Sequence, residues 1–172
     1  MGPVSAEVEI DVPRERAFSF VGDLANRPSF TDHFISGFHL TRIESSGMGA
    51  GARFRFDVPL HRIWADTTIV ELEAPFRIVE HGRGGRGNRV PSRTVWELTE
   101  APGSLIKARV SYWTEPSHPT DKGREALVAA SARYERGWRE AMRRLRDLLE
   151  GGVPAEGRIA VAGGNRYATG IP

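Results

Sequence analysis

The hydrophobic pattern is most regular between residues 121 and 150. Apolar side chains recur there every three or four positions, which is the spacing of one face of an α-helix, and charged side chains fill the positions between them. Thr120 or Asp121 can cap the start of this helix, and Gly151 follows its end. At ~1.5 Å per residue the predicted helix is roughly 45 Å long, so another layer of the protein must cover its apolar face. The residues of that face are Leu127, Ala130, Tyr134, Trp138, Met142, Leu145 and Leu149.

The N-terminal part of the chain predicts one strand and two short helices. Residues 4–12 alternate between apolar and polar side chains, as a half-buried strand does. Pro13 stands at a first helical position, and apolar residues follow it at helical spacing as far as Leu24. A second short helix is expected over residues 29–34.

From residue 35 onward, short segments rich in β-branched and aromatic residues alternate with turns marked by Gly and Pro. The connections between consecutive segments are short, which favours an antiparallel meander over β-α-β units. The expected strands are 38–44, 52–58, 63–73, 77–82, 91–99 and 105–114.

This order of elements predicts an α+β helix-grip fold. In that fold a curved antiparallel sheet, here of about seven strands, surrounds a long C-terminal helix, and two short helices follow the first strand. One domain is expected over residues 1–150. The remaining residues, 151–172, form a tail rich in Gly and Pro, which either docks on its own domain or a sister subunit or stays disordered.

Composition excludes several kinds of chemistry. The absence of Cys rules out disulfides, thiolate nucleophiles and Cys metal ligands, and the five His residues show no metal-binding spacing, so neither a metal nor a cofactor is predicted. The pI of 9.4 reflects heavy use of Arg beside a net charge of only +2, which is a weak argument for a nucleic-acid partner. We expect a cytoplasmic protein without a membrane span, and a homodimer is left open.

Four segments resemble the polyketide cyclase/dehydrase and lipid-transport family of the START/Bet v 1-like (SRPBCC) superfamily. They are "VEIDVPRERAFSFVGDLANRPSF", "GMGAGARFRF", "VELEAPFRIVEHG" and "TEAPGSLIKARVSY", in the same order and at similar spacing. The likeness covers residues 4–150 and departs from the family at Phe30, where a Trp is common. It implies a cavity between the sheet and the last helix that binds a hydrophobic or aromatic, polyketide- or lipid-like molecule. Some members of the family also cyclise or dehydrate their ligands.

Alternation along each strand indicates which side chains face that cavity. Residues 63–73 are ambiguous, because Val70 and Leu72 agree with an inward Trp64 and Asp66 whereas Ile69 favours the opposite face; we adopt the first register. In the long helix, Tyr134 and Trp138 are expected to meet the ligand. The predicted lining is Phe54, Phe56, Trp64, Ile78, Trp96, Val110, Tyr112, Tyr134, Trp138 and Met142.

Two carboxylates, Glu80 and Asp66, are predicted to face inward. A buried carboxyl group with a raised pKa can act as a general acid or base, so both are candidate catalytic residues. The alternative is a carboxylate that pairs with an Arg near the rim of the cavity.

Three functions follow. The favoured one is a carrier or ligand-binding protein for a hydrophobic small molecule, and the alternative is an aromatase/cyclase- or dehydratase-type enzyme that uses a buried carboxylate with a Tyr. The third is an RNA- or protein-interaction module that uses the Arg-rich link 82–89 and the charged face of the long helix. That link is more simply a mobile basic hairpin tip than an RNA-binding tract, so no nucleic-acid partner is predicted.

Overall fold

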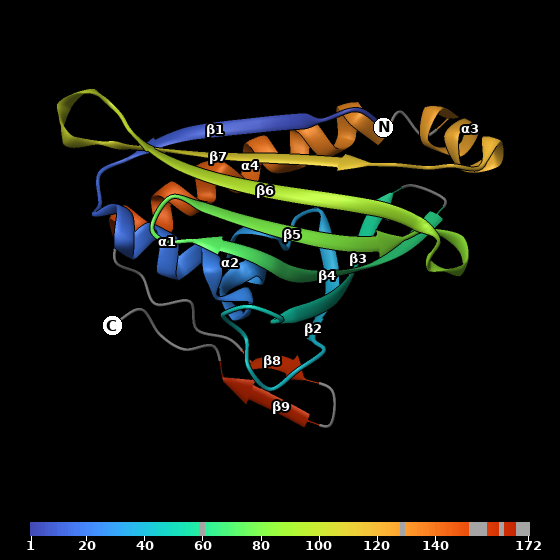
Figure 1. Ribbon diagram of the computed structural model, residues 1–172, viewed down its shortest axis with the longest axis horizontal. Coiled ribbons are helices and arrows are strands. Elements are labelled where there is room, and N and C mark those ends of the chain that lie inside the picture. Colours follow the sequence, from blue (N-terminus) through green and yellow to red (C-terminus); the bar gives the residue numbers. More distant parts are fainter. Residues whose placement is uncertain (59–60, 128–129, 152–157, 162–163, 168–172) are drawn as a thin grey trace.

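The computed structural model describes residues 1–58, 61–127, 130–151, 158–161 and 164–167, and it consists of a curled sheet with helices on its inner face (Figure 1). Going across the sheet, the strands follow the order β1-β7-β6-β5-β4-β3-β2-β8-β9. The strands are β1 (Val4–Ile10), β2 (Ile35–Leu40), β3 (Gly51–Val58), β4 (His61–Glu73), β5 (Arg77–Gly84), β6 (Val90–Glu100), β7 (Ile106–Thr114), β8 (Arg158–Val161) and β9 (Gly164–Tyr167).

The predicted helix-grip fold is confirmed. Strands β1 to β7 pair antiparallel with their neighbours, and each lies close to a segment where the alternation of side chains predicts a strand. From the C-terminal segment, β8 pairs in parallel with β2 at the edge of this meander, through His39 with Ala160 and Leu40 with Val161. Strand β9 then pairs with β8.

The helices occur in the predicted order along the chain. The helix expected over 121–150 corresponds to α3 as far as Leu127 and to α4 from Ala130, and residues 128–129 between them lie outside the described part of the chain. The helices are α1 (Arg14–Gly22), α2 (Arg27–Thr31), α3 (Pro119–Leu127) and α4 (Ala130–Gly151), with short 3-10 turns η1 (Leu24–Asn26), η2 (Arg86–Asn88) and η3 (Pro102–Ser104).

Helix α4 runs alongside β1, and α3 lies beyond the start of that strand, next to the N-terminus (Figure 1). At one end the amino group of Met1 lies 2.7 Å from Glu125 of α3, and at the other end the backbone N–H of Asp11 donates to Glu150 of α4 at 2.9 Å. The apolar stripe of α4 faces the sheet, and Trp138, Met142 and Leu145 are buried there. The 3.6-residue periodicity thus identifies the correct face of α4.

Strand β4 corrects the predicted register. Ala65, Thr67 and Ile69 are buried, so the odd-numbered residues of the first half face inward. A β-bulge between Ile69 and Glu71 then reverses the alternation, and Leu72 pairs with the inward Ile78. An inward Ile69 and an inward Leu72 are therefore both correct, because the strand does not keep one alternation along its length.

The predicted inward orientation of Trp64 and Asp66 is consequently wrong. Trp64 is 40% exposed on the outer face, where the guanidinium carbons of Arg53 and Arg55 lie 5.5 and 5.9 Å from the centre of its ring. Asp66 accepts hydrogen bonds from the backbone N–H of Arg83 at 2.9 Å and from Asn88 Nδ2 at 2.6 Å. It thus fastens the β5–β6 connection and does not face the interior.

Candidate ligand-binding site

An aromatic cluster fills the space between the sheet and α4. The ring of Phe56 on β3 meets Tyr134 on α4 edge to face, with 4.6 Å between centroids, and Tyr134 lies 5.2 Å from Tyr112 on β7. Trp138 makes similar edge contacts with Trp96 on β6, at 5.7 Å, and with Phe34, at 5.3 Å. Such tilted arrangements are the favoured geometry of packed aromatic rings.

Nine of the ten side chains predicted to line the cavity are buried, whereas Trp64 lies on the outer face. Their part in ligand binding stays a prediction. The buried nine are Phe54, Phe56, Ile78, Trp96, Val110, Tyr112, Tyr134, Trp138 and Met142.

A pocket of about 450 Å³ opens from this cluster to the surface, between the α2–β2 turn, the end of β3 and the first half of α4. Its volume lies in the range of small-molecule sites. Phe34, Phe56 and Tyr134 provide its aromatic surface. The other lining residues are His33, Asp57, Arg133, Arg136, Gly137, Arg139, Glu140 and Arg143.

The close approach of Phe34 to α4 shapes this pocket. A Cβ atom on Gly137 would lie 2.5 Å from the ring of Phe34, so only Gly allows the ring to rest against the helix backbone. Beside it, Nε2 of His33 donates to the carbonyl oxygen of Gly137 at 3.0 Å. Since that oxygen can only accept, Nε2 carries the proton of this bond.

Sequence patterns did not single out His33 or Phe34 as site residues. Both follow α2 directly, outside any strand whose alternation could orient them. Gly137 within the predicted helix could have indicated that another segment packs closely there, because an interior helical Gly often marks a close contact.

The hydroxyls of Tyr112 and Tyr134 and the indole N–H of Trp138 lie in this interior. Burial raises the pKa of Tyr112 well above its ordinary value, with a further contribution from Tyr134. Burial likewise raises the pKa of Tyr134, assisted by the charge of Glu125. Nε1 of Trp138 is buried without a hydrogen-bond partner among the described residues. These groups are therefore neutral hydrogen-bond donors at ordinary pH.

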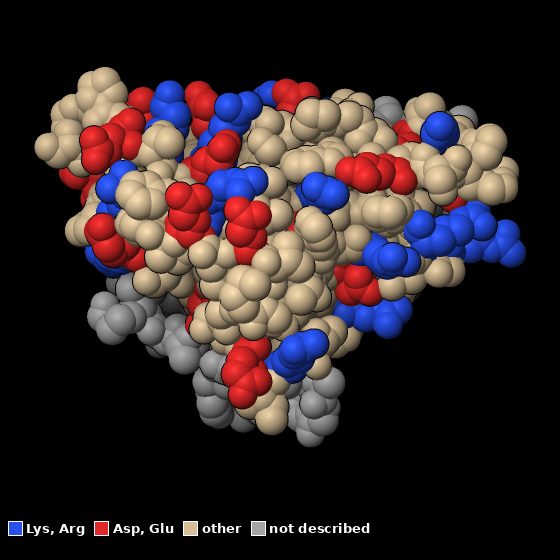
Figure 2. Space-filling view, in the orientation of Figure 1, with Lys and Arg blue, Asp and Glu red and all other residues tan. Residues whose placement is uncertain are grey.

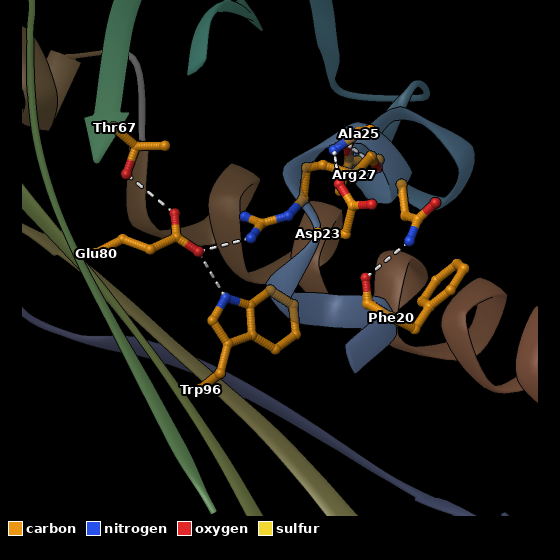
Figure 3. A network of polar contacts seen from close by, with 9 residues as sticks. Phe20, Asp23, Ala25, Arg27, Thr67, Glu80 and Trp96 are labelled. Atoms are coloured by element: carbon orange, nitrogen blue, oxygen red, sulfur yellow. Dashed lines mark hydrogen bonds and ion pairs between the residues drawn. The ribbon is translucent and has the colours of Figure 1, made fainter. Parts of the chain in front are cut away.

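Glu80, the other candidate catalytic residue, points inward as predicted, but its carboxylate is hydrogen-bonded within a buried polar network (Figure 3). Its Oε1 accepts from Arg27 Nη2 at 2.6 Å and from Trp96 Nε1 at 3.0 Å, and its Oε2 accepts from Thr67 Oγ1 at 3.0 Å. The guanidinium of Arg27 also lies 5.0 Å from the centre of the Trp96 ring. The side chains of Arg27 and Glu80 are only 5% and 1% exposed.

This network matches the predicted alternative, a carboxylate paired with an Arg, except that the pair is buried and not at a rim. Three donors satisfy the carboxylate of Glu80, and neither Glu80 nor Arg27 lines the 450 Å³ pocket. Local sequence offers no signal for Arg27, because the two partners lie 53 residues apart and meet only in the folded protein.

A basic surface lies at the end of the sheet where β5 turns into β6, and Figure 2 shows Lys and Arg side chains gathered there. In this turn, Arg89 is bound to Asp121 of α3 by two hydrogen bonds of 2.8 and 3.0 Å. This pair connects the hairpin tip to α3, which gives Arg89 a structural contact in addition to its charge.

No cluster of three or more His, Asp or Glu side chains suited to a metal ion occurs within the part of the chain that the structure describes. None of the described helices is both long and apolar enough to cross a membrane.

Comparison with known proteins identifies solved structures that have a similar fold. A scan of protein-family models and a search of curated proteins each find no match to the sequence. Solved structures do match: the solution structure of KanY has a TM-score of 0.66 at 17% identity, with 88% of this chain and 100% of that chain covered. Major latex-like protein 151 from Panax ginseng has a TM-score of 0.56 at 13% identity, with 84% and 94% covered.

The chain has a Bet v 1-like (SRPBCC) fold. A further match is DynU16, a protein in the dynemicin biosynthetic locus, with a TM-score of 0.57 at 20% identity. The alignment covers 88% of this chain but 48% of DynU16, so the chain spans about half its length. At these identities the matches establish the Bet v 1-like fold, and the function has to be argued from the site.

Proposed function

We propose that the protein binds a hydrophobic or aromatic small molecule, as a carrier or ligand-binding protein. The observation that carries the proposal is the 450 Å³ pocket, because its aromatic surface of Phe34, Phe56 and Tyr134 continues into the buried cluster. A flat apolar ligand would bury its surface against these rings. The neutral hydroxyl of Tyr134 would be available to a polar group on the ligand.

The described residues support binding better than a cyclase or dehydratase reaction. Such a reaction needs an acid or base beside the ligand, and Glu80 is bonded to three donors while Asp66 lies on the outer face. Of the acidic side chains that do line the pocket, Asp57 and Glu140 are both paired with arginines.

A fluorescence titration with 1-pyrenebutanol tests the proposal, because pyrene emission reports transfer into an apolar site. We expect saturable binding of one molecule per chain. Phe34→Leu should raise the Kd roughly threefold to tenfold, since a lost aromatic contact is worth about 0.5–1.5 kcal/mol.

Phe76→Leu is the matched control, because Phe76 is 45% exposed under Arg14 and does not line the pocket. It should leave the Kd unchanged. Absence of saturable binding, or equal Kd values for the two variants, would overturn the proposal.

A further inference from the structure

The exposed part of the pocket is strongly cationic. Among the described residues, four arginines, Arg133, Arg136, Arg139 and Arg143, line it beside two carboxylates, so these residues have a formal charge of +2 with His33 neutral. The whole chain has the same net charge of +2 over 172 residues. The pocket opening therefore has a local excess of positive charge.

The two carboxylates of the pocket already have cationic partners. Asp57 accepts from Ser36 Oγ at 2.8 Å and from Arg55 Nε at 3.4 Å, and Arg55 lies outside the pocket. Glu140 lies 3.0 Å from Arg143 and 3.4 Å from Arg144, which is also outside the pocket. Because cations from outside the pocket share in this pairing, the carboxylates do not neutralise all of its arginines.

Arg136 carries the uncompensated charge most directly. Arg139 pairs with Glu135 at 2.5 Å, whereas Arg136 forms no ion pair or hydrogen bond with any described residue. It stands between Tyr134, whose ring is part of the aromatic surface, and Gly137, against which Phe34 packs. An arginine at this position can lay its methylene stem along apolar surface and keep its guanidinium at the opening.

We propose that the pocket selects an amphipathic organic acid, with its apolar body against Phe34, Phe56 and Tyr134 and its carboxylate at Arg136 and Arg133. This inference rests on the proposed binding function and adds the chemical class of the ligand. Guanidinium groups bind carboxylates through paired, charge-assisted hydrogen bonds, which a neutral ligand of the same shape cannot form. The opening thus favours an acid over the corresponding alcohol.

Two probes with the same apolar body test the inference, namely 1-pyrenebutyrate and 1-pyrenebutanol. The measured quantity is the ratio of their Kd values, compared between the wild type and each variant, because this comparison cancels the intrinsic difference in hydrophobicity between the acid and the alcohol. We expect Arg136→Gln and Arg133→Gln each to shift this ratio against the acid by roughly threefold to tenfold. The Kd of the alcohol should change by less than twofold.

Arg146→Gln is the control, because Arg146 lies on the same helix, pairs with Asp147 and does not line the pocket. It should leave the ratio at its wild-type value. A ratio that is unchanged in Arg136→Gln and Arg133→Gln, or that shifts equally in Arg146→Gln, overturns the selection of an acid while the binding function stands. Failure of both probes to bind overturns the binding function itself.

Discussion

At the scale of single residues, the contact between Gly137 and Phe34 determines the form of the pocket. Helix propensity alone makes an interior Gly unfavourable by about 1 kcal/mol relative to Ala. The partly buried ring of Phe34 reverses that preference, because it lies where a side chain on residue 137 would start. Gly137 thus serves the packing of Phe34 and not the flexibility of the helix.

Gly137→Ala should therefore lower the free energy of unfolding by about 1–3 kcal/mol, the usual cost of forcing extra volume into a packed site. Gly123→Ala in α3 is the matched control. Apart from the adjoining backbone of the helix, no atom of the described residues lies within 4 Å of the added Cβ there, so this variant should gain up to about 1 kcal/mol. Urea denaturation of both variants provides the measurement, and a stabilising Gly137→Ala would show that Phe34 does not rest on the helix.

Tyr112 and Tyr134 predict how stability depends on alkaline pH. Their pKa values are raised in the folded protein by burial, whereas in the unfolded chain they return to about 10. The folded state therefore favours the neutral phenols. Their contribution to stability is fully present below about pH 10 and is lost as the pH rises from there toward their raised folded pKa values.

Phenolate absorbance measured against pH tests this directly. Two of the three tyrosines should resist ionisation in the native protein above pH 10 and should ionise normally in concentrated guanidinium. Tyr112→Phe should reduce the loss of stability above pH 10. Ionisation of all three tyrosines near pH 10 in the native protein would contradict the burial of this pair.

At the scale of elements, the network around Glu80 fastens α2 to the sheet. Arg27 begins α2, while Thr67, Glu80 and Trp96 come from the adjacent strands β4, β5 and β6 (Figure 3). The same helix leads into Phe34, which forms part of the pocket. The network therefore positions Phe34, although Arg27 and Glu80 themselves do not line the pocket.

Glu80→Gln should lower the free energy of unfolding by about 3–5 kcal/mol, because it leaves the buried charge of Arg27 uncompensated. Removing both charges in Arg27→Met/Glu80→Gln should cost less than the sum of the two single variants. Asp66→Asn makes the same chemical change on the neighbouring strand, at the outer face, and should cost less than about 1 kcal/mol. Equal losses for Glu80→Gln and Asp66→Asn in urea denaturation would exclude a buried ion pair.

Strand β4 shows where prediction from sequence ends at this scale. The alternation of apolar residues located β3, β6 and β7 and their inward faces, because each keeps one register throughout. In β4 the bulge after Ile69 changes the register within the strand, so any single alternation misorients half of it. Trp64 and Asp66 fell in that half.

At the scale of the whole molecule, the order of elements predicted the helix-grip architecture, and the described structure confirms it. The pocket could not be predicted in the same way. It combines the α2–β2 turn, the end of β3 and the face of α4 beside its buried stripe, and no local periodicity relates these three segments. The Arg27–Glu80 pair has the same long-range origin.

The most direct test of a ligand site between the sheet and α4 is to locate a bound hydrophobic molecule from amide chemical shifts during titration with 1-pyrenebutanol. We expect shifts concentrated at His33 and Phe34, at Phe56 and Asp57, and along residues 133–143. The outer-face residues Trp64 and Asp66 should not respond. Shifts confined to the outer face of the sheet, or no shifts at saturating probe, would contradict a ligand site between the sheet and α4.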